Sequence, residues 1–250
     1  MAIPWTVKRQ ITYFLVFVVI IFTAAYFIWK GVTKPTCSDG RRNQGEEGID
    51  CGGPCQEKCL GEVKELYTDW TKIFEISKGK YDVAALIKNN NLFLALPSLK
   101  YQFKFYDKNN ILIGIKEGKT FITPGEIFPI FETGVDVGSR IPSRVFIEFE
   151  NNPGWQRIEK EKPSLVVSKK QFFNEPPFPR LAVTLENKSV VPVYNIFIAA
   201  ILYGKDKNVQ GVSVTKIDAI SGESSEEIVF TWPQIFSEEL SPDILFKTGL

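Results

Sequence analysis

One stretch of the sequence limits where the rest of the chain can lie. Residues 11–29 read ITYFLVFVVIIFTAAYFIW and contain no charged side chain. As a helix rising 1.5 Å per residue, this stretch would cover about 28 Å, close to the hydrocarbon thickness of a bilayer. Trp5 and Trp29 stand where amphipathic rings favour the membrane interface. The stretch predicts one transmembrane helix over residues 11–29, preceded by a short N-terminal tail of residues 1–10.

A cleaved secretory signal peptide is the alternative interpretation of this stretch. A charged start followed by an apolar run fits a signal peptide, and Thr-Ala-Ala at residues 23–25 resembles a small-residue cleavage site. The apolar run is longer than the roughly 7–15 residues of a signal core, and it continues to Trp29 beyond that site. We therefore expect an uncleaved signal-anchor.

The cysteines indicate the side of the membrane on which the rest of the chain lies. More basic residues follow the apolar stretch than precede it, so the positive-inside rule alone would place the C-terminal part in the cytoplasm. However, the chain's four cysteines all lie just beyond the apolar stretch, at Cys37, Cys51, Cys55 and Cys59. This clustering is typical of an oxidising compartment. We expect a single-pass protein of the cell membrane with extracytoplasmic C-terminal domains.

The cysteine-rich linker module, residues 30–60, is too polar to fold by burying apolar side chains. Its centre reads CSDGRRNQGEEGIDCGGPCQEKC. Two disulfides among the four cysteines are the expected source of order, and three pairings are open. Four thiolates around zinc are the alternative for an intracellular protein.

The same module contains four side chains with oxygen ligands of the kind that calcium takes: Asp39, Asn43, Glu46 and Asp50. An EF-hand is excluded, because Arg41 and Gln44 stand where its loop needs an acceptor and a glycine. The alternative is that the four side chains form turns between glycines. Calcium is the only cofactor that the sequence suggests.

Composition excludes several classes of function. The chain has 30 basic and 29 acidic residues, whereas a nucleic-acid-binding protein shows a basic excess, so no nucleic-acid partner is expected. It has no histidine, which excludes Ser-His-Asp, Cys-His and histidine–zinc sites. A hydrolase using carboxylates alone remains an alternative, with adjacent pairs such as Glu226-Glu227. Neighbouring carboxylates on a strand point to opposite faces, so we expect no enzyme.

An internal repeat divides the rest of the chain at an offset of 97 residues. The aligned positions are Tyr106 with Tyr203, Gly114 with Gly211, and Gly125-Glu126 with Gly222-Glu223. With one residue of slippage, Asn89 aligns with Asn187. We expect two similar domains, at residues 61–160 and 161–250.

Each domain reads as β-strands, because apolar residues alternate with polar ones. Tyr101, Phe103 and Phe105 alternate with polar side chains, whereas residues 196–203 are apolar on both faces, as in a strand covered on both sides. Residues 62–75 also fit a helix, but we expect an edge strand near residues 69–76. Turn signals at short intervals indicate two antiparallel sandwiches, so the fold class is mainly β.

Two motifs carry a resemblance to known families. Phe103-Lys104-Phe105-Tyr106-Asp107 resembles the FxLYD-type unit, an immunoglobulin-like sandwich related to LEA-type domains. The second domain has Ile201-Leu202-Tyr203-Gly204 instead. The pattern CxDGxxNxxExxxDCGGxC resembles cysteine modules beside membrane anchors in bacterial surface proteins. The whole layout is similar to envelope proteins of small, uncultivated bacteria, which implies tandem immunoglobulin-like sandwiches and an envelope location, but no reaction.

These observations predict a non-enzymatic binding or structural module of the cell envelope. Residues 11–29 would contact the membrane, and two sandwiches in a stalk would meet a protein or envelope partner through loops or strand edges. The alternative is a subunit of a larger envelope or secretion/adhesion assembly.

Overall fold

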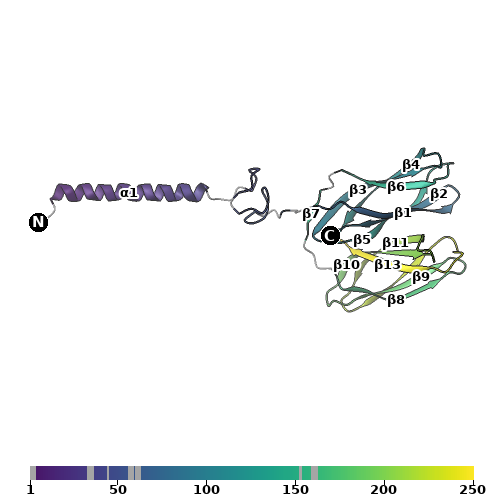
Figure 1. Ribbon diagram of the computed structural model, residues 1–250. Coiled ribbons are helices and arrows are strands. Elements are labelled where there is room, and N and C mark those ends of the chain that lie inside the picture. Colours follow the sequence, from purple (N-terminus) through teal and green to yellow (C-terminus); the bar gives the residue numbers. More distant parts are fainter. Residues whose placement is uncertain are drawn as a thin grey trace. The chain divides into compact units, whose positions relative to one another are not determined.

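The computed structural model describes residues 4–32, 37–43, 45–55, 59, 63–151, 154–158 and 163–250. It divides the chain into two compact units, residues 1–61 and residues 62–250. The protein is mainly β, with one N-terminal helix, two disulfides and several antiparallel sheets (Figure 1). The predicted fold class is confirmed at this level.

The N-terminal helix α1 spans Trp5–Val32 and is long and apolar enough to cross a membrane. It begins inside the segment expected to be a tail. Thr12 and Thr23 donate their hydroxyls to the carbonyls of Lys8 and Val19, each at 2.9 Å, which satisfies polar groups within the helix itself.

The strands of residues 62–250 fall into two groups along the chain. The first group consists of β1 (Tyr67–Ser77), β2 (Lys80–Lys88), β3 (Leu94–Tyr106), β4 (Leu112–Ile122), β5 (Ile127–Asp136), β6 (Arg144–Phe149) and β7 (Gln156–Arg157). The second group consists of β8 (Leu165–Phe173), β9 (Arg180–Asn187), β10 (Val193–Tyr203), β11 (Val209–Ile220), β12 (Ser225–Thr231) and β13 (Ser241–Thr248). Strand β1 confirms the expected edge strand and excludes the helix considered there.

Both groups have the same strand order. The first forms the sheets β1-β2-β5 and β4-β3-β6, with β7 added to β3. The second forms the sheets β8-β9-β12 and β11-β10-β13. Strand β8 therefore corresponds to β1, β9 to β2, and so on up to β13, which corresponds to β6. All pairings are antiparallel. The boundary expected near residue 160 lies outside the described residues, between β7 and β8.

Alternating side chains fill a separate core in each sandwich. Tyr101, Phe103 and Phe105 of β3 are buried with Val83 and Ile87 of β2 in the first. In the second, the buried apolar side chains of β9 are Leu181, Val183 and Leu185, which pack against those of β10. The alternation in the sequence therefore identified the inward faces correctly.

A third apolar cluster joins the two sandwiches. Ala84 and Leu86 point from β2 to the face opposite its own core, and they pack in one cluster with Ile201 of β10 and Val212 of β11. Strands β2 and β10 are thus buried on both faces, which explains the apolar run of residues 196–203. Sheet β1-β2-β5 packs on sheet β11-β10-β13, an arrangement that differs from the expected stalk.

A buried asparagine closes the same end of each sandwich. Asn89 donates its amide to the carbonyls of Leu94 and Thr123, at 2.8 and 2.9 Å. Asn187 donates its amide to the carbonyls of Val191 and Ser221, at 2.8 and 3.1 Å. Each asparagine thereby ties two loops together.

Equivalent backbone hydrogen bonds at this end show that the structural alignment of the two sandwiches differs from the sequence repeat by one residue. Gly125 N–H donates to Asn91 O, and Glu223 N–H donates to Ser189 O, both at 2.9 Å. Glu223 therefore takes the place of Gly125, although the sequence repeat aligned it with Glu126. Both residues have a positive φ, 60° for Gly125 and 52° for Glu223.

We expect Phe103→Ala to lower the free energy of unfolding by about 3–5 kcal/mol, because the ring is fully buried in the first core. Chemical denaturation of the detergent-solubilised protein measures this change. Phe146→Ala is the control, since Phe146 is half exposed on β6 and its loss should cost no more than about 0.5 kcal/mol. Equal losses in the two variants would contradict the assignment of Phe103 to the core.

Candidate functional site

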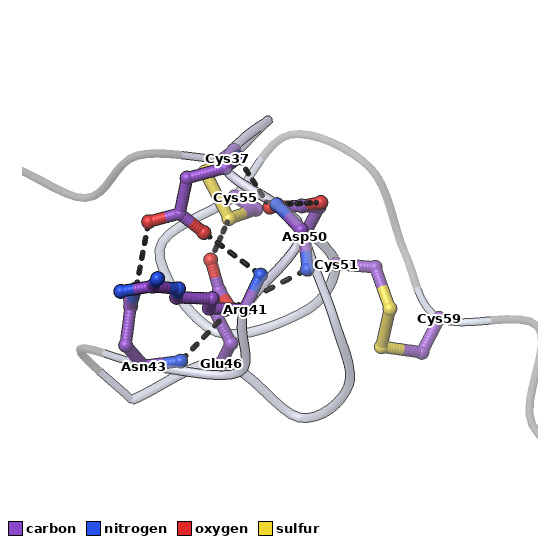
Figure 2. Close-up of a disulfide and its surroundings, with 10 residues drawn as sticks. Cys37, Arg41, Asn43, Glu46, Asp50, Cys51, Cys55 and Cys59 are labelled. Atoms are coloured by element: carbon purple, nitrogen blue, oxygen red, sulfur yellow. Dashed lines mark hydrogen bonds between the residues drawn. A yellow bond between two sulfur atoms is a disulfide. The ribbon is translucent and has the colours of Figure 1, made fainter.

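The four cysteines form two disulfides, Cys37–Cys55 and Cys51–Cys59, and no cysteine is free (Figure 2). This confirms the disulfide prediction and selects one of the three open pairings. The zinc alternative is wrong for this structure, because it needs four thiolates and every cysteine is cross-linked. Gly48 lies against the second disulfide, where a Cβ would approach Sγ of Cys51 and of Cys59 to 2.8 Å.

The two aspartates expected as calcium ligands accept hydrogen bonds from backbone N–H groups. Asp50 accepts from Asp39 N–H at 2.9 Å and from Gly40 N–H at 2.8 Å. Asp39 in turn accepts from Arg41 N–H and from the Asn43 side-chain amide, each at 2.9 Å. These contacts fold the first turn of the module back onto its second half.

Glu46 is buried at the centre of the module. Its Oε2 accepts N–H groups of Asn43 and Asp50 at 3.1 and 3.4 Å. Its Oε1 lies 3.4 Å from Cys55 Sγ, which has no hydrogen to donate because it belongs to a disulfide. The structure thus brings all four predicted side chains together, with carboxylate oxygens directed at N–H groups.

One group of potential metal ligands occurs among the described residues of the chain: Cys37, Glu46 and Cys55, with ligand atoms within 4.8 Å of one another. Both sulfurs belong to the same disulfide, so Glu46 is the one member with a ligand-competent atom. The calcium hypothesis therefore depends on the carboxylates and Asn43 alone, and they already fit the turn-forming alternative.

A buried ion pair at the junction of the two sandwiches was not predicted from the sequence. Lys247 Nζ of β13 lies 3.0 Å from Glu126 Oε1, and the two side chains are only 5% and 4% exposed. Lys247 also donates to Phe121 O at 2.8 Å, and Nζ lies 4.2 Å from the centre of the Phe121 ring. Glu126 Oε2 accepts the N–H and the hydroxyl of Thr123 at 2.6 and 2.8 Å.

Both members of the ion pair therefore make further hydrogen bonds to the first sandwich. Burial lowers the pKa of the Lys247 ammonium, and the Glu126 carboxylate acts in the opposite direction. The available signal in the sequence was a charged residue, Lys247, directly after the apolar run Ile-Leu-Phe. Its partner is 121 residues away, so no local pattern pairs the two.

A cavity of about 410 Å³ lies beside this pair. Its walls come from the loops at one end of both sandwiches and are mostly apolar, with Leu92, Ile127, Phe246 and Leu250 among them. Glu126 and Lys247 also line it, but each already bonds the other.

Comparisons with known proteins show no family. No family model and no curated protein sequence matches the chain. Among solved structures it is similar to red sea bream transglutaminase, with 12% identity and a TM-score of 0.24, over 74% of this chain and 29% of that one. A tandem CBM22-1-CBM22-2 domain of Paenibacillus barcinonensis Xyn10C gives 8% identity and a TM-score of 0.14, over 76% and 87%. Likenesses this low carry no argument about function.

The calcium hypothesis predicts that chelation loosens the cysteine module. In the non-reduced protein, a calcium chelator should then accelerate tryptic cleavage after Arg41 or Arg42, and added calcium should reverse the effect. Asp50→Asn is the matched variant, because it removes the charge while keeping an oxygen near Asp39 N–H and Gly40 N–H. If the cleavage rate is the same with and without calcium in both proteins, the calcium hypothesis is wrong and the four side chains only form turns.

We expect Lys247→Ala to lower the free energy of unfolding by about 3–5 kcal/mol, because it leaves the Glu126 charge buried without a cation. The double variant Lys247→Met, Glu126→Gln should recover most of this loss, since no charge then remains buried. Denaturant titration measures both. Lys216→Ala removes an exposed lysine of β11 and serves as the control. A loss no larger than the control's would show that the pair does not hold the junction.

Proposed function

We propose that this protein is a single-pass, membrane-anchored envelope protein whose residues 63–250 act outside the cytoplasm as a non-enzymatic binding or structural module. The single observation that carries the location is the pair of disulfides next to an apolar helix. Disulfides persist in oxidising compartments and are rare in the cytosol. A polar module held together by them would lose its order on the cytoplasmic side.

The two sandwiches, in this proposal, are copies of one immunoglobulin-like unit of the FxLYD type. The identical strand order of the two groups supports this, as do the equivalent hydrogen bonds of Asn89 and Asn187. Asp107 of the motif accepts the N–H groups of Asn109 and Ile111, at 2.9 and 3.0 Å. The motif thus has a structural role, which supports a binding or structural protein over an enzyme.

One surface favours the alternative of a subunit in a larger envelope assembly. On the outer face of sheet β4-β3-β6, Ile115 and Phe146 flank Lys104 from the two neighbouring strands. Leu112 pairs with Tyr106 in the next row, and all three apolar side chains, Leu112, Ile115 and Phe146, are exposed. Recovery of the protein in a detergent-stable complex, lost in Ile115→Lys, Phe146→Lys, would support this alternative.

The proposed topology predicts that protease added to intact spheroplasts removes the C-terminal domains. A tag placed after Leu250 should disappear, while a cytoplasmic marker protein stays intact until the cells are lysed. The expected result follows from an uncleaved anchor with its C-terminal side outward. Protection of the tag in intact spheroplasts, followed by digestion after lysis, would place these domains in the cytoplasm.

A further inference from the structure

Two equivalent loops each present a pair of adjacent, exposed apolar side chains. Between β2 and β3, Leu92 is 71% and Phe93 52% exposed. Between β9 and β10, Val190 is 78% and Val191 60% exposed. Single exposed apolar residues are ordinary, but paired ones at the same place in two sandwiches call for a binding explanation.

The two loops lie at the same end of residues 62–250. Lys247, near the end of β13, contacts Glu126, which follows the turn bonded to the Leu92 loop. Thr248 pairs with Ile196 near the start of β10, where the Val190 loop ends. The cavity of about 410 Å³ at the junction is lined by Leu92 of the first sandwich and by Thr248 of the second.

This end is also where the chain enters the sandwiches from its N-terminal side. Lys64 N–H donates to Asn91 Oδ1 at 2.8 Å, and the Asn91 amide donates back to Lys64 O at 2.7 Å. The Leu92 loop is therefore held directly beside the incoming chain. The Cys37–Cys55 disulfide joins Cα atoms 5.6 Å apart, so the covalent path from Val32 to Val63 cannot exceed roughly 50 Å.

Hydrogen bonds hold both loops in the conformation that exposes the apolar pairs. Asn89 and Asn187 tie each loop to the neighbouring turn, and both asparagines are almost fully buried. In the first loop, Phe93 O accepts Ile158 N–H at 2.8 Å, and the Arg157 guanidinium lies 5.4 Å from the Phe93 ring. An arginine beside an exposed aromatic ring suits a surface that combines apolar chains with phosphate groups.

We propose that Leu92-Phe93 and Val190-Val191 insert into the surface of the lipid bilayer in which helix α1 is anchored. This inference rests on the proposed membrane anchoring. The chain between Val32 and Val63 is a tether of limited reach, which raises the effective concentration of the lipid surface at this end. Two small apolar pairs therefore suffice for binding to the bilayer, whereas a protein without an anchor would need a larger apolar patch. The partner is a lipid surface, because adjacent apolar side chains on loop tips match the boundary between headgroups and acyl chains.

The test uses the full chain reconstituted at low density in vesicles of phosphatidylcholine and phosphatidylglycerol. One cysteine is added at a time, as Leu92→Cys or Val190→Cys, and labelled with an environment-sensitive fluorophore while the native cysteines stay in disulfides. Ile141→Cys is the control, since Ile141 is 75% exposed in the loop between β5 and β6 at the opposite end. Lipids that carry a nitroxide at a shallow acyl carbon report insertion, and flotation of the vesicles reports anchoring.

We expect a blue shift and quenching for the labels at positions 92 and 190, and neither for the label at position 141. Adding Phe93→Asp and Val191→Asp should abolish quenching. Flotation should not change, because helix α1 provides the anchor, and the fold should tolerate the changes, because both replaced side chains are exposed. Equal signals at the three positions in floating protein would overturn the inference while leaving the anchor intact. A blue shift that grows with protein density, without quenching, would assign the loops to a second copy. Failure to float would overturn the anchoring itself.

Discussion

The arrangement of the β-rich unit depends on two strands, β2 and β10, that are buried on both faces. Each gives alternate side chains to its own core and the others to the contact between sandwiches. Small residues such as Ala84 at this contact let the two sheets approach closely. Separating the sandwiches would expose the apolar faces of both sheets to water. Because burial of apolar area stabilises by about 25 cal/mol per Å², this separation is unfavourable. Residues 62–250 therefore fold as one unit.

Much of this fold could be predicted from the sequence, because strand periodicity and turn residues are local signals. The inward faces of β3 and β9 follow from alternation, and the doubly covered run of β10 follows from apolar side chains at successive positions. The side-by-side packing could not be predicted in the same way. An apolar outer face fits a sandwich neighbour, a partner protein or a membrane equally well, and only the positions of Ala84 and Ile201 in one cluster decide between them.

The candidate sites show the same division between local and distant information. The turn that Asp107 forms can be predicted from the sequence, because donor and acceptor lie within four residues of each other. In the second sandwich Gly204 replaces this aspartate, and Asp206 takes over part of the task by accepting Asn208 N–H at 2.9 Å. The Lys247–Glu126 pair was missed because a strand pattern identifies a buried position but not the distant charge that makes a buried lysine tolerable.

The cysteine module shows how order arises where apolar burial is absent. Fixing each backbone residue costs on the order of 1–2 kcal/mol, whereas a disulfide typically contributes about 2–4 kcal/mol. Two cross-links alone are therefore too few for a segment of this length. The carboxylates of Asp39, Glu46 and Asp50 add charge-assisted hydrogen bonds to backbone N–H groups of these turns. Acidic residues at these positions thus have a structural role in the module, and the buried Glu46 lies 3.4 Å from the Cys55 sulfur of the Cys37–Cys55 cross-link.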